Sequence, residues 1–386
     1  MKLNESATVT INSLAKQKIA AGIDIFNLSA GEPELMPHPI IVDAALQALQ
    51  QGKTLYPPVA GIPELRQAAS QWMNREYHCN FNTDQCVVTP GGKFAIYLLL
   101  QYLLKPEDEV IIPAPYWVSY PSITGLFGGK ACIVATHAEH GWKLTPQQLT
   151  AACHARSRIL ILNNACNPTG AFYSREELQA LLAVAEQHGL WVISDEVYSG
   201  LCFDDQPYVS CGAFAQHRER VIVVQSCSKS FAMTGWRIGF TFAPLAIIQA
   251  LTILLGQSTS GASTLSQWAA TAALQQSTTV NSYVNGELKK RRNTLVNALN
   301  AAFNLQIAAP LSSLYLFVSL PALGVTEPSS QRFCERALAE ANVAIVPGIA
   351  FGQEGFIRLS FGAEPERLTQ AVAALADFCR QTYPDH

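Results

Sequence analysis

The chain contains 386 residues, a length that predicts two or three domains and a core large enough to be stable by itself. Apolar residues make up 49% of the chain and charged residues only 14%, which excludes a disordered protein. The 26 basic and 29 acidic side chains leave a net charge of −3. This balance offers neither a basic surface for nucleic acid nor a polybasic membrane anchor, so we expect a small-molecule partner.

The N-terminal segment lacks the apolar core of a signal peptide. The most apolar stretch, Ala246–Leu255, is too short to span a bilayer, and we expect it to form a buried helix. The ten cysteines are spread singly and none has CxxC spacing, so no metal site is expected. Scattered thiols in a chain without a signal sequence predict a cytoplasmic protein with no membrane association.

The middle of the chain alternates short apolar runs with helical patterns. The runs that predict strands, rich in Val and Ile, are Val87–Thr89, Val110–Pro113, Cys132–Ala135, Ile159–Leu162, Trp191–Ser194 and Val221–Val224. Their unbroken apolar character is typical of a largely parallel sheet that helices cover on both faces. Helices are expected over Gly92–Leu104 and after Ser174, whose spacing to Glu177 is that of a capping box. This alternation predicts a doubly wound α/β domain.

The last hundred residues show a different pattern of helices and strands. The predicted elements are helices at Leu288–Ala302 and Pro365–Cys379 and strands at Leu314–Val318, Ala344–Val346 and Ile357–Ser360. This mixture predicts a smaller α+β domain, to which we also assign the first 45 residues because they have no place in the sheet. The expected boundaries are therefore 46–285 for the large domain and 1–45 with 286–386 for the small domain.

Polar residues follow several predicted strands, at the edge where open parallel sheets bind ligands. The run TPGGK, Thr89–Lys93, exposes backbone N–H groups at a helix start, which suits an anion or simply a tight turn. Asn167 in NNACNPTG precedes a proline, a pattern that usually caps a turn. Asp195 in SDEVY ends an apolar strand, where a carboxylate caps a helix, lies at an exposed strand end, or holds a cation such as a protonated ring nitrogen.

The segment SCSKSFAMTGWRIGF, Ser226–Phe240, places a lysine and an arginine in apolar surroundings. Lys229, between small hydroxyl residues, can lose its charge and act as a nucleophile, although a solvated loop lysine is commoner. The context of Arg237 predicts a buried guanidinium with a partner. With the glycine turn and Asp195, these groups suit pyridoxal phosphate: lysine for the aldehyde, carboxylate for the ring nitrogen, and arginine with backbone donors for the phosphate.

These residues lie in motifs that resemble the class I, fold-type-I pyridoxal-phosphate aminotransferases, the group of the bacterial aspartate aminotransferases. The motifs are NLSAGEPE (Asn27–Glu34), LYPPVAGIPELR (Leu55–Arg66), PYWVSYP (Pro115–Pro121), NPTG (Asn167–Gly170) and FIRLSFG (Phe356–Gly362). Together with SDEVY and SxxK followed by MTGWRIG, they cover nearly the whole chain. The resemblance implies a large α/β domain with a mostly parallel, seven-stranded sheet covered by helices, and a smaller α+β domain.

The resemblance also implies roles around the cofactor ring. Lys229 matches the lysine that bonds to the cofactor aldehyde and later moves the substrate proton. Asp195 matches the carboxylate that pairs with the pyridine nitrogen. Asn167 and Tyr198 match the two donors to the ring's phenolic oxygen, and Trp117 matches the aromatic residue stacked on the ring. Lys229, Asp195 and Tyr198 are thus the expected catalytic residues.

Phosphate contacts are implied in the same way. Ser226, Arg237 and the backbone of Gly92 and Lys93 match the residues that bind the cofactor phosphate. Tyr56 matches a tyrosine that reaches the phosphate in the neighbouring subunit. The resemblance therefore implies a homodimer whose active sites are shared between the two chains.

Substrate contacts complete the set that the resemblance implies. Arg358 matches the arginine that binds the α-carboxylate as a bidentate fork, and Gly31 matches a backbone donor to the same carboxylate. Lys93 occupies the position that binds the distal carboxylate in one branch of the group. Trp117 and Asn167 are expected to contact both cofactor and substrate.

The resemblance favours transamination between L-aspartate and 2-oxoglutarate, which gives oxaloacetate and L-glutamate. A lysine discriminates less sharply than a bidentate arginine, so a broader or aromatic specificity is an alternative. A β-lyase on the same fold is a second alternative, because the early chemical steps are shared. A regulatory protein with a degenerate fold is a third, although such proteins usually carry an added DNA-binding segment.

Overall fold

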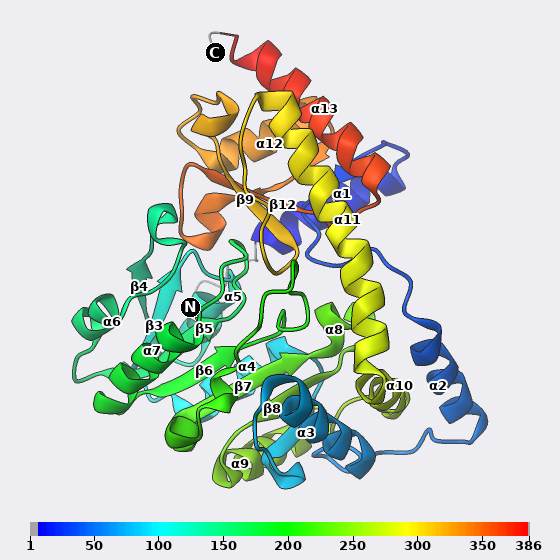
Figure 1. The fold of residues 1–386 in the computed structure, drawn as a ribbon, viewed down its shortest axis with the longest axis vertical. Coiled ribbons are helices and arrows are strands. Elements are labelled where there is room, and N and C mark those ends of the chain that lie inside the picture. The colour runs from blue at the N-terminus through cyan, green and yellow to red at the C-terminus, as the bar shows by residue number, and fades with distance from the viewer. Residues whose placement is uncertain (1–6, 385–386) are drawn as a thin grey trace.

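A seven-stranded sheet forms the centre of the large lobe in the computed structural model, which describes residues 7–384 (Figure 1). In spatial order, the strands are β2 (Cys86–Thr89), β8 (Gly239–Phe242), β7 (Val221–Ser226), β6 (Trp191–Asp195), β5 (Ser157–Asn163), β3 (Glu109–Ala114) and β4 (Lys130–Ala135). All pairs are parallel except those that β8 makes with β2 and β7. The predicted fold class is confirmed, and β8 is a strand that the sequence pattern did not reveal.

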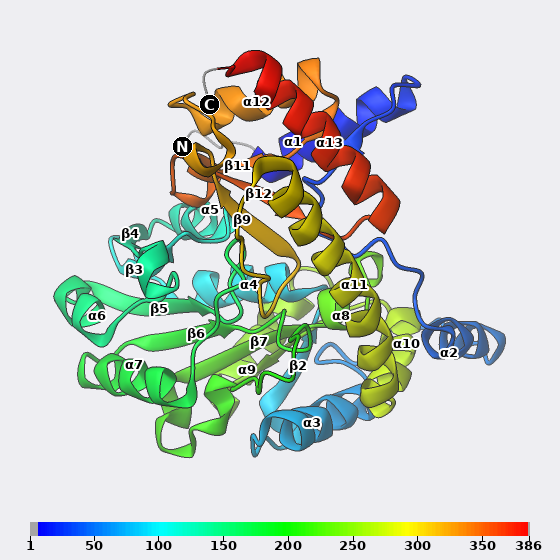
Figure 2. The same ribbon diagram turned by 45° about the horizontal axis from the view of Figure 1, so that its top comes forward.

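The sheet has an apolar core on each face, which explains the unbroken apolar runs. In β5, Leu160 and Leu162 point into one core, whereas Ile159 and Ile161 point into the other. Helices cover both faces (Figures 1 and 2). On the first face lie α3 (Pro63–Tyr77), α6 (Pro146–Ala152), α7 (Arg175–Gln187) and α10 (Thr264–Gln275). On the second face lie α4 (Gly92–Leu103), α5 (Ser119–Leu126) and α9 (Leu245–Gly256).

Two of these helices test local expectations. The capping box of α7 is confirmed, because the Ser174 hydroxyl accepts from the Glu177 amide while the Glu177 carboxylate accepts from the Ser174 amide. The predicted helix at Ala246–Leu255 is confirmed as part of α9, but the expectation that it is buried is wrong for one face. Ile253 is 66% exposed there, because only one side of the helix packs on the sheet.

The small lobe contains two short sheets. β11 (Val346–Pro347), β12 (Phe356–Ser360) and β9 (Tyr315–Ser319) form an antiparallel sheet, and β1 (Phe26–Asn27) pairs in parallel with β10 (Val343–Ala344). Its helices are α1 (Ala7–Ala20), α12 (Ser330–Glu340) and α13 (Pro365–Thr382). The single strand predicted at Ala344–Val346 is wrong. The chain leaves one sheet after Ala344 and joins the other at Val346, and the run is apolar because both ends are buried.

One helix spans both lobes, and a second lies in the segment of the chain that connects them. α11 (Ser277–Phe303) runs from α10 in the large lobe up to α13 in the small lobe (Figure 1). α2 (Pro39–Gln50) packs against α10 and projects from the side of the molecule in both views (Figure 2). The expected domain boundaries at 45/46 and 285/286 thus fall inside α2 and α11. Within residues 7–384, no helix combines the length and apolar character needed to cross a bilayer.

The antiparallel strand β8 brings Gly239 directly against the turn that precedes α4. A Cβ at position 239 would lie 2.6 Å from the carbonyl carbon of Gly91 and from the amide nitrogen of Gly92. Backbone atoms cannot move aside like a flexible side chain, so position 239 requires glycine.

We therefore expect Gly239→Ala to displace the turn and lower stability by about 1–3 kcal/mol, the usual effect of overpacking. Thermal unfolding of the variant and the wild type measures this difference. Gly235→Ala is the matched control, because a Cβ at Gly235 meets no atom within 4 Å. Equal unfolding midpoints for the 239 and 235 variants would show that the close approach has no energetic effect.

Candidate active site

A cavity of about 390 Å³ lies between the two lobes, at the carboxyl ends of β5, β6 and β7. Eleven of the twelve predicted site residues line it, namely Gly31, Gly92, Lys93, Trp117, Asn167, Asp195, Tyr198, Ser226, Lys229, Arg237 and Arg358. The structure thus brings together residues that are up to 327 positions apart, the separation of 358 and 31. The topology explains this convergence, because parallel strands end at one edge and the small lobe covers that edge.

Tyr56 is the predicted site residue that lies elsewhere. Its side chain is 92% exposed, and it lines a separate surface groove with Pro57 and residues 259–265. Within one chain it therefore takes no part in the cavity.

The N-terminus of α4 forms one wall of the cavity. Gly91 precedes the helix with φ of 90°, and no side chain caps the helix there. Ser226 and Ser228, which are hydrogen-bonded to each other at 2.9 Å, also line this part of the cavity. Uncapped N–H groups at a helix start, together with hydroxyl donors, form a site for an anion such as a phosphate.

Arg237 lies beside the same helix start. Its guanidinium donates to the carbonyl of Thr234 at 2.9 Å and to that of Pro90 at 3.4 Å, and a side chain at Gly91 would collide with it. The prediction that Arg237 is buried is wrong: its side chain is exposed, because the cavity is open at this wall. The guanidinium has no acidic partner among residues 7–384, so its charge is available to an anion.

Asp195 is the acidic group of the cavity. It is 3% exposed, and the Tyr120 hydroxyl donates to its Oδ2 at 2.6 Å while the Val197 amide donates to Oδ1 at 3.4 Å. Burial raises the pKa of Asp195 to about 6, although both donors act in the opposite direction. No cation pairs with this carboxylate in the described part of the chain, so a ligand with a positive charge would satisfy it.

Lys229 is carried by α8 (Cys227–Ser230), a single turn that follows β7 directly. Its ammonium donates to the backbone carbonyl of Gly31, which lies in the small lobe. Burial lowers the pKa of Lys229, and the nearby charges of Tyr315 and Glu32 oppose this only in part. A lysine with a lowered pKa is a better nucleophile and base at neutral pH.

Arg358 on β12 is the most deeply buried cation of the cavity, at 2% exposure. Its guanidinium donates to Asn167 Oδ1 at 3.0 Å and to the Ser29 carbonyl at 2.7 Å, and its Nε has no partner. The Tyr315 ring lies 4.1 Å from the guanidinium carbon. All these partners are neutral, and nowhere in residues 7–384 does a carboxylate pair with Arg358. Such a group fits an incoming carboxylate.

Lys93 and Trp117 lie together on the large-lobe side. The Lys93 ammonium is 5.0 Å from the centre of the Trp117 ring. Partial burial, followed by the charges of Arg237 and Lys229, lowers the pKa of Lys93. The cavity is thus lined by four basic side chains and one acidic side chain, Asp195, and it favours ligands that carry several negative charges.

Three side chains that matter here were not predicted. Tyr120 hydrogen-bonds Asp195 and stands edge-on to Trp117, with ring centres 5.2 Å apart. Asn163 accepts from the Asn167 amide at 2.7 Å and so holds that residue in place. Tyr120 lies in the first turn of the helix that follows Trp117, and an aromatic residue there suits a core equally well, so it gave no signal. Tyr315, the third, gave no signal, because an aromatic residue in an apolar strand is usually core.

The comparisons with known proteins agree with this geometry. Residues 23–375 match the family described as aminotransferase class I and II, and the chain belongs to this family. It is 37% identical to the aspartate/prephenate aminotransferase of Thermus thermophilus over 377 residues, which cover 97% of this chain and 96% of that protein. It is 34% identical to the aspartate aminotransferase of Bacillus subtilis over 379 residues, which cover 97% and 96%.

Solved structures give the same result. The aspartate aminotransferase of Thermus thermophilus with maleate has a TM-score of 0.92 and 37% identity, over 97% of each chain. The aspartate aminotransferase of Rhizobium meliloti also has a TM-score of 0.92, at 32% identity over 98% of this chain and 97% of that one. The protein is therefore an aminotransferase that depends on pyridoxal phosphate, as the resemblance implied. The comparisons do not favour the β-lyase or the regulatory alternative.

The hydrogen bond from Tyr120 to Asp195 leads to a measurable expectation. Tyr120→Phe removes a donor that lowers the pKa of Asp195, so this pKa should rise by about one unit. A carboxyl group must be ionised to pair with a protonated ring nitrogen. Cofactor affinity should therefore begin to fall at a higher pH in the variant than in the wild type.

Spectroscopic titration of the cofactor-free protein with pyridoxal phosphate between pH 5 and 9 measures this shift. The titration of the cofactor itself is common to both proteins, so their difference isolates the protein group. Tyr102→Phe is the control, because Tyr102 is 47% exposed and its hydroxyl makes no hydrogen bond in the described residues. Identical pH profiles for the 120 variant and the wild type would contradict the expectation.

Proposed function

We propose that this protein transfers the amino group of L-aspartate to 2-oxoglutarate, giving oxaloacetate and L-glutamate. The observation that carries the proposal is the buried guanidinium of Arg358, which has no acidic partner in residues 7–384. It shares one cavity with a second cation, Lys93, from the opposite lobe. Two cations suit a substrate with two carboxylates, and the related enzymes named above are aspartate aminotransferases.

The residues present fit the cofactor of the family. The uncapped start of α4 with Ser226 and Arg237 suits its phosphate, Asp195 suits its ring nitrogen, and Lys229 suits its aldehyde. Trp117 provides a face for the ring, beside the cofactor position that these groups define. When bound, pyridoxal phosphate supplies an aldehyde that condenses with amines and a ring that withdraws electrons from the attached carbon.

The protein side of the reaction is binding, orientation and proton transfer. Arg358 holds the α-carboxylate through two parallel N–H donors, and the Gly31 backbone adds a third. Lys229, freed from its contact with the Gly31 carbonyl, would take the proton from the substrate Cα as a neutral amine and deliver it to the carbon of the cofactor that had carried the aldehyde. Asn167 and Tyr198, which line the same cavity, would donate hydrogen bonds to the phenolic oxygen of the bound cofactor. Lys93 holds the distal carboxylate of the substrate.

The distal carboxylate makes Lys93 the residue that sets specificity. A single ammonium lacks the planar fork of arginine, so discrimination against other side chains should be modest. Five related proteins are named as aspartate/prephenate or probable aspartate/prephenate aminotransferases, and prephenate therefore belongs among the acceptors to be tested.

We also propose that the protein is a homodimer in which Tyr56 reaches the phosphate site of the partner. Support comes from exposed apolar side chains along one stretch of the chain, with Leu46 at 52%, Leu55 at 81% and Tyr56 at 92% exposure. Leu46 lies on α2, which projects from the molecule (Figure 2). A second copy would cover this stretch and complete the site.

We also propose a division of the chain into two domains. Residues 46–285 form the large, cofactor-binding domain, and residues 1–45 with 286–386 form the small domain that closes over substrate. Support comes from the pairing of β1 with β10, which ties the N-terminal segment to the C-terminal part of the chain. Gly31 and Arg358, both on the small-lobe side, move with that domain.

We further propose a cytoplasmic location. All ten cysteines are free thiols in the structure, and six of them are buried without a bonded partner sulfur: Cys79, Cys86, Cys211, Cys227, Cys334 and Cys379. A reducing compartment keeps thiols in this state.

An assay of the purified holoenzyme with aspartate and 2-oxoglutarate tests the function. We expect equimolar oxaloacetate and glutamate, no reaction without the acceptor, and no turnover by Lys229→Ala. Arg358→Lys should lower kcat/KM by about two orders of magnitude, because one bidentate, charge-assisted pair is lost. Lys93→Ala should lower kcat/KM for aspartate about tenfold more than for alanine. Equal effects on both substrates would remove Lys93 from the specificity role.

The shared site can be tested by mixing two inactive variants. Tyr56→Ala and Lys229→Ala are unfolded together, refolded as a mixture and assayed at low cofactor concentration. If Tyr56 serves the partner's site, each hybrid dimer has one complete site, and activity returns to about a quarter of the wild-type value. If hybrid dimers are shown to form but no activity returns, the proposal of a shared site is contradicted.

A further inference from the structure

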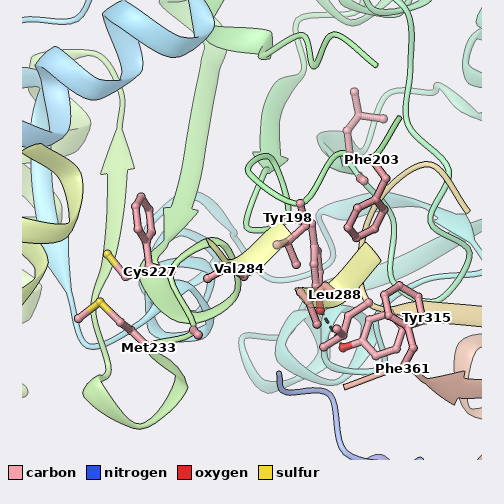
Figure 3. Packing of buried hydrophobic residues seen from close by; sticks show 14 of the residues in the cluster. Tyr198, Phe203, Cys227, Met233, Val284, Leu288, Tyr315 and Phe361 are labelled. Atoms are coloured by element: carbon pink, nitrogen blue, oxygen red, sulfur yellow. Dashed lines mark hydrogen bonds between the residues drawn. The ribbon is translucent and has the colours of Figure 1, made fainter. Parts of the chain in front are cut away.

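Tyr315 lies at the start of β9 and contacts three residues of the cavity. Its side chain is 1% exposed, and its hydroxyl is 2.9 Å from the hydroxyl of Tyr198, as the dashed line in Figure 3 shows. Its ring lies 4.1 Å from the guanidinium carbon of Arg358. A Cβ at Gly31 would lie 2.6 Å from its hydroxyl oxygen, so Gly31 packs directly on it.

The two hydroxyls share a single hydrogen bond, and neither makes another within the described chain. Each hydroxyl has one proton to donate. If Tyr198 donates to the phenolic oxygen of the cofactor, then Tyr315 must be the donor in the pair. Tyr315 thereby fixes the direction in which the Tyr198 proton points.

The ring of Tyr315 acts on a different partner. Arg358 is buried with neutral acceptors only, and the face of an aromatic ring stabilises a guanidinium most strongly when water is absent. The ring is itself held, since Tyr198 stands edge-on to it at 72° with ring centres 5.9 Å apart. Leu288 and Phe361 belong to the same buried cluster (Figure 3). Tyr315 therefore has little freedom to turn.

We propose that Tyr315 is a positioning residue. Its ring orients Arg358, which binds the substrate carboxylate, and its hydroxyl orients Tyr198, which donates to the phenolic oxygen of the cofactor. The inference rests on the proposed function for the roles of Arg358 and Tyr198. One side chain thus orients both partners, and its hydroxyl can be removed while its ring is kept.

Tyr315→Phe keeps the ring and removes the hydroxyl. In the holoenzyme, the pKa of the visible absorption band of the cofactor should rise by about half to one unit, because the Tyr198 donor loses its orientation. The dissociation constant of succinate, a dicarboxylate with no amino group, should stay within twofold of wild type. Tyr315→Leu removes both halves, so the band should shift equally and succinate should bind about tenfold more weakly.

A double-mutant cycle shows whether the hydroxyl acts through Tyr198. In a Tyr198→Phe background, adding Tyr315→Phe should leave the pKa of the band unchanged. Tyr173→Phe is the control, since it removes a buried hydroxyl that accepts from the Leu144 amide outside the cavity, and it should move neither quantity. An unshifted band in Tyr315→Phe, or a full additional shift in the double variant, would overturn the proposal.

These measurements are independent of turnover with aspartate. Wild-type protein that binds cofactor and succinate but transfers no amino group from aspartate would refute the proposed substrate and leave the link standing. If the wild type transfers the amino group of aspartate but the cofactor band of Tyr315→Phe keeps the wild-type pKa, the proposed substrate stands and the link through Tyr315 is refuted.

Discussion

A buried positive charge without a negative partner in the described part of the chain is the main physical constraint on this structure. Arg358 has only 2% of its side chain exposed, and its donors end on an amide oxygen and a backbone carbonyl. Burying a charge is unfavourable by several kcal/mol even when neutral groups solvate it. Asp195 is a buried carboxylate without a cationic partner among the described residues, and burial raises its pKa to about 6. In the proposed function, two ligands satisfy these groups: the protonated ring nitrogen of the cofactor pairs with Asp195, and the α-carboxylate of the substrate pairs with Arg358.

Only the two-lobe architecture can hold these two charges in one cavity. Asp195 ends a central strand of the large sheet, whereas Arg358 lies in the middle of a small-lobe strand that approaches from above (Figure 1). Lys229 crosses between the lobes through its bond to the Gly31 carbonyl. Opening the lobes would separate the groups and let water reach them. In the proposed closure of the small domain over substrate, ligand binding and lobe closure are therefore coupled, because each lowers the free energy that the other requires.

The elements that could be predicted from the sequence are those whose residue pattern has only one structural explanation. Strands such as β5 are apolar throughout because helices cover both faces of the sheet, and this pattern was readable. Gly239 begins β8, where glycine is needed for a close backbone approach, and the short run after it resembles a loop. Ala344 and Val346 look like one strand because nothing local marks a change of sheet.

The same reasoning separates the predicted site residues from the missed ones. Charged groups such as Asp195 and Lys229 stand out at apolar strand ends, so their chemistry could be inferred. Tyr120 and Tyr315 could not, because an aromatic ring in an apolar run suits a core equally well, and only the position of its hydroxyl shows its second contact. Tyr56 is exposed in one chain, and its contribution depends on a partner whose position no single-chain pattern specifies.

Charge balance in the cavity connects cofactor binding to substrate choice. Lys93, Lys229, Arg237 and Arg358 face a single carboxylate, Asp195, and the mutual repulsion of the first three contributes to the lowered pKa of Lys93. An anion at the start of α4, beside Arg237, cancels part of that repulsion and favours the charged form of Lys93. At the proposed position, the phosphate of the cofactor would thus do more than anchor the ring. By favouring the charged form of Lys93, it would prepare the large-lobe side of the cavity for the second carboxylate of a dicarboxylic substrate.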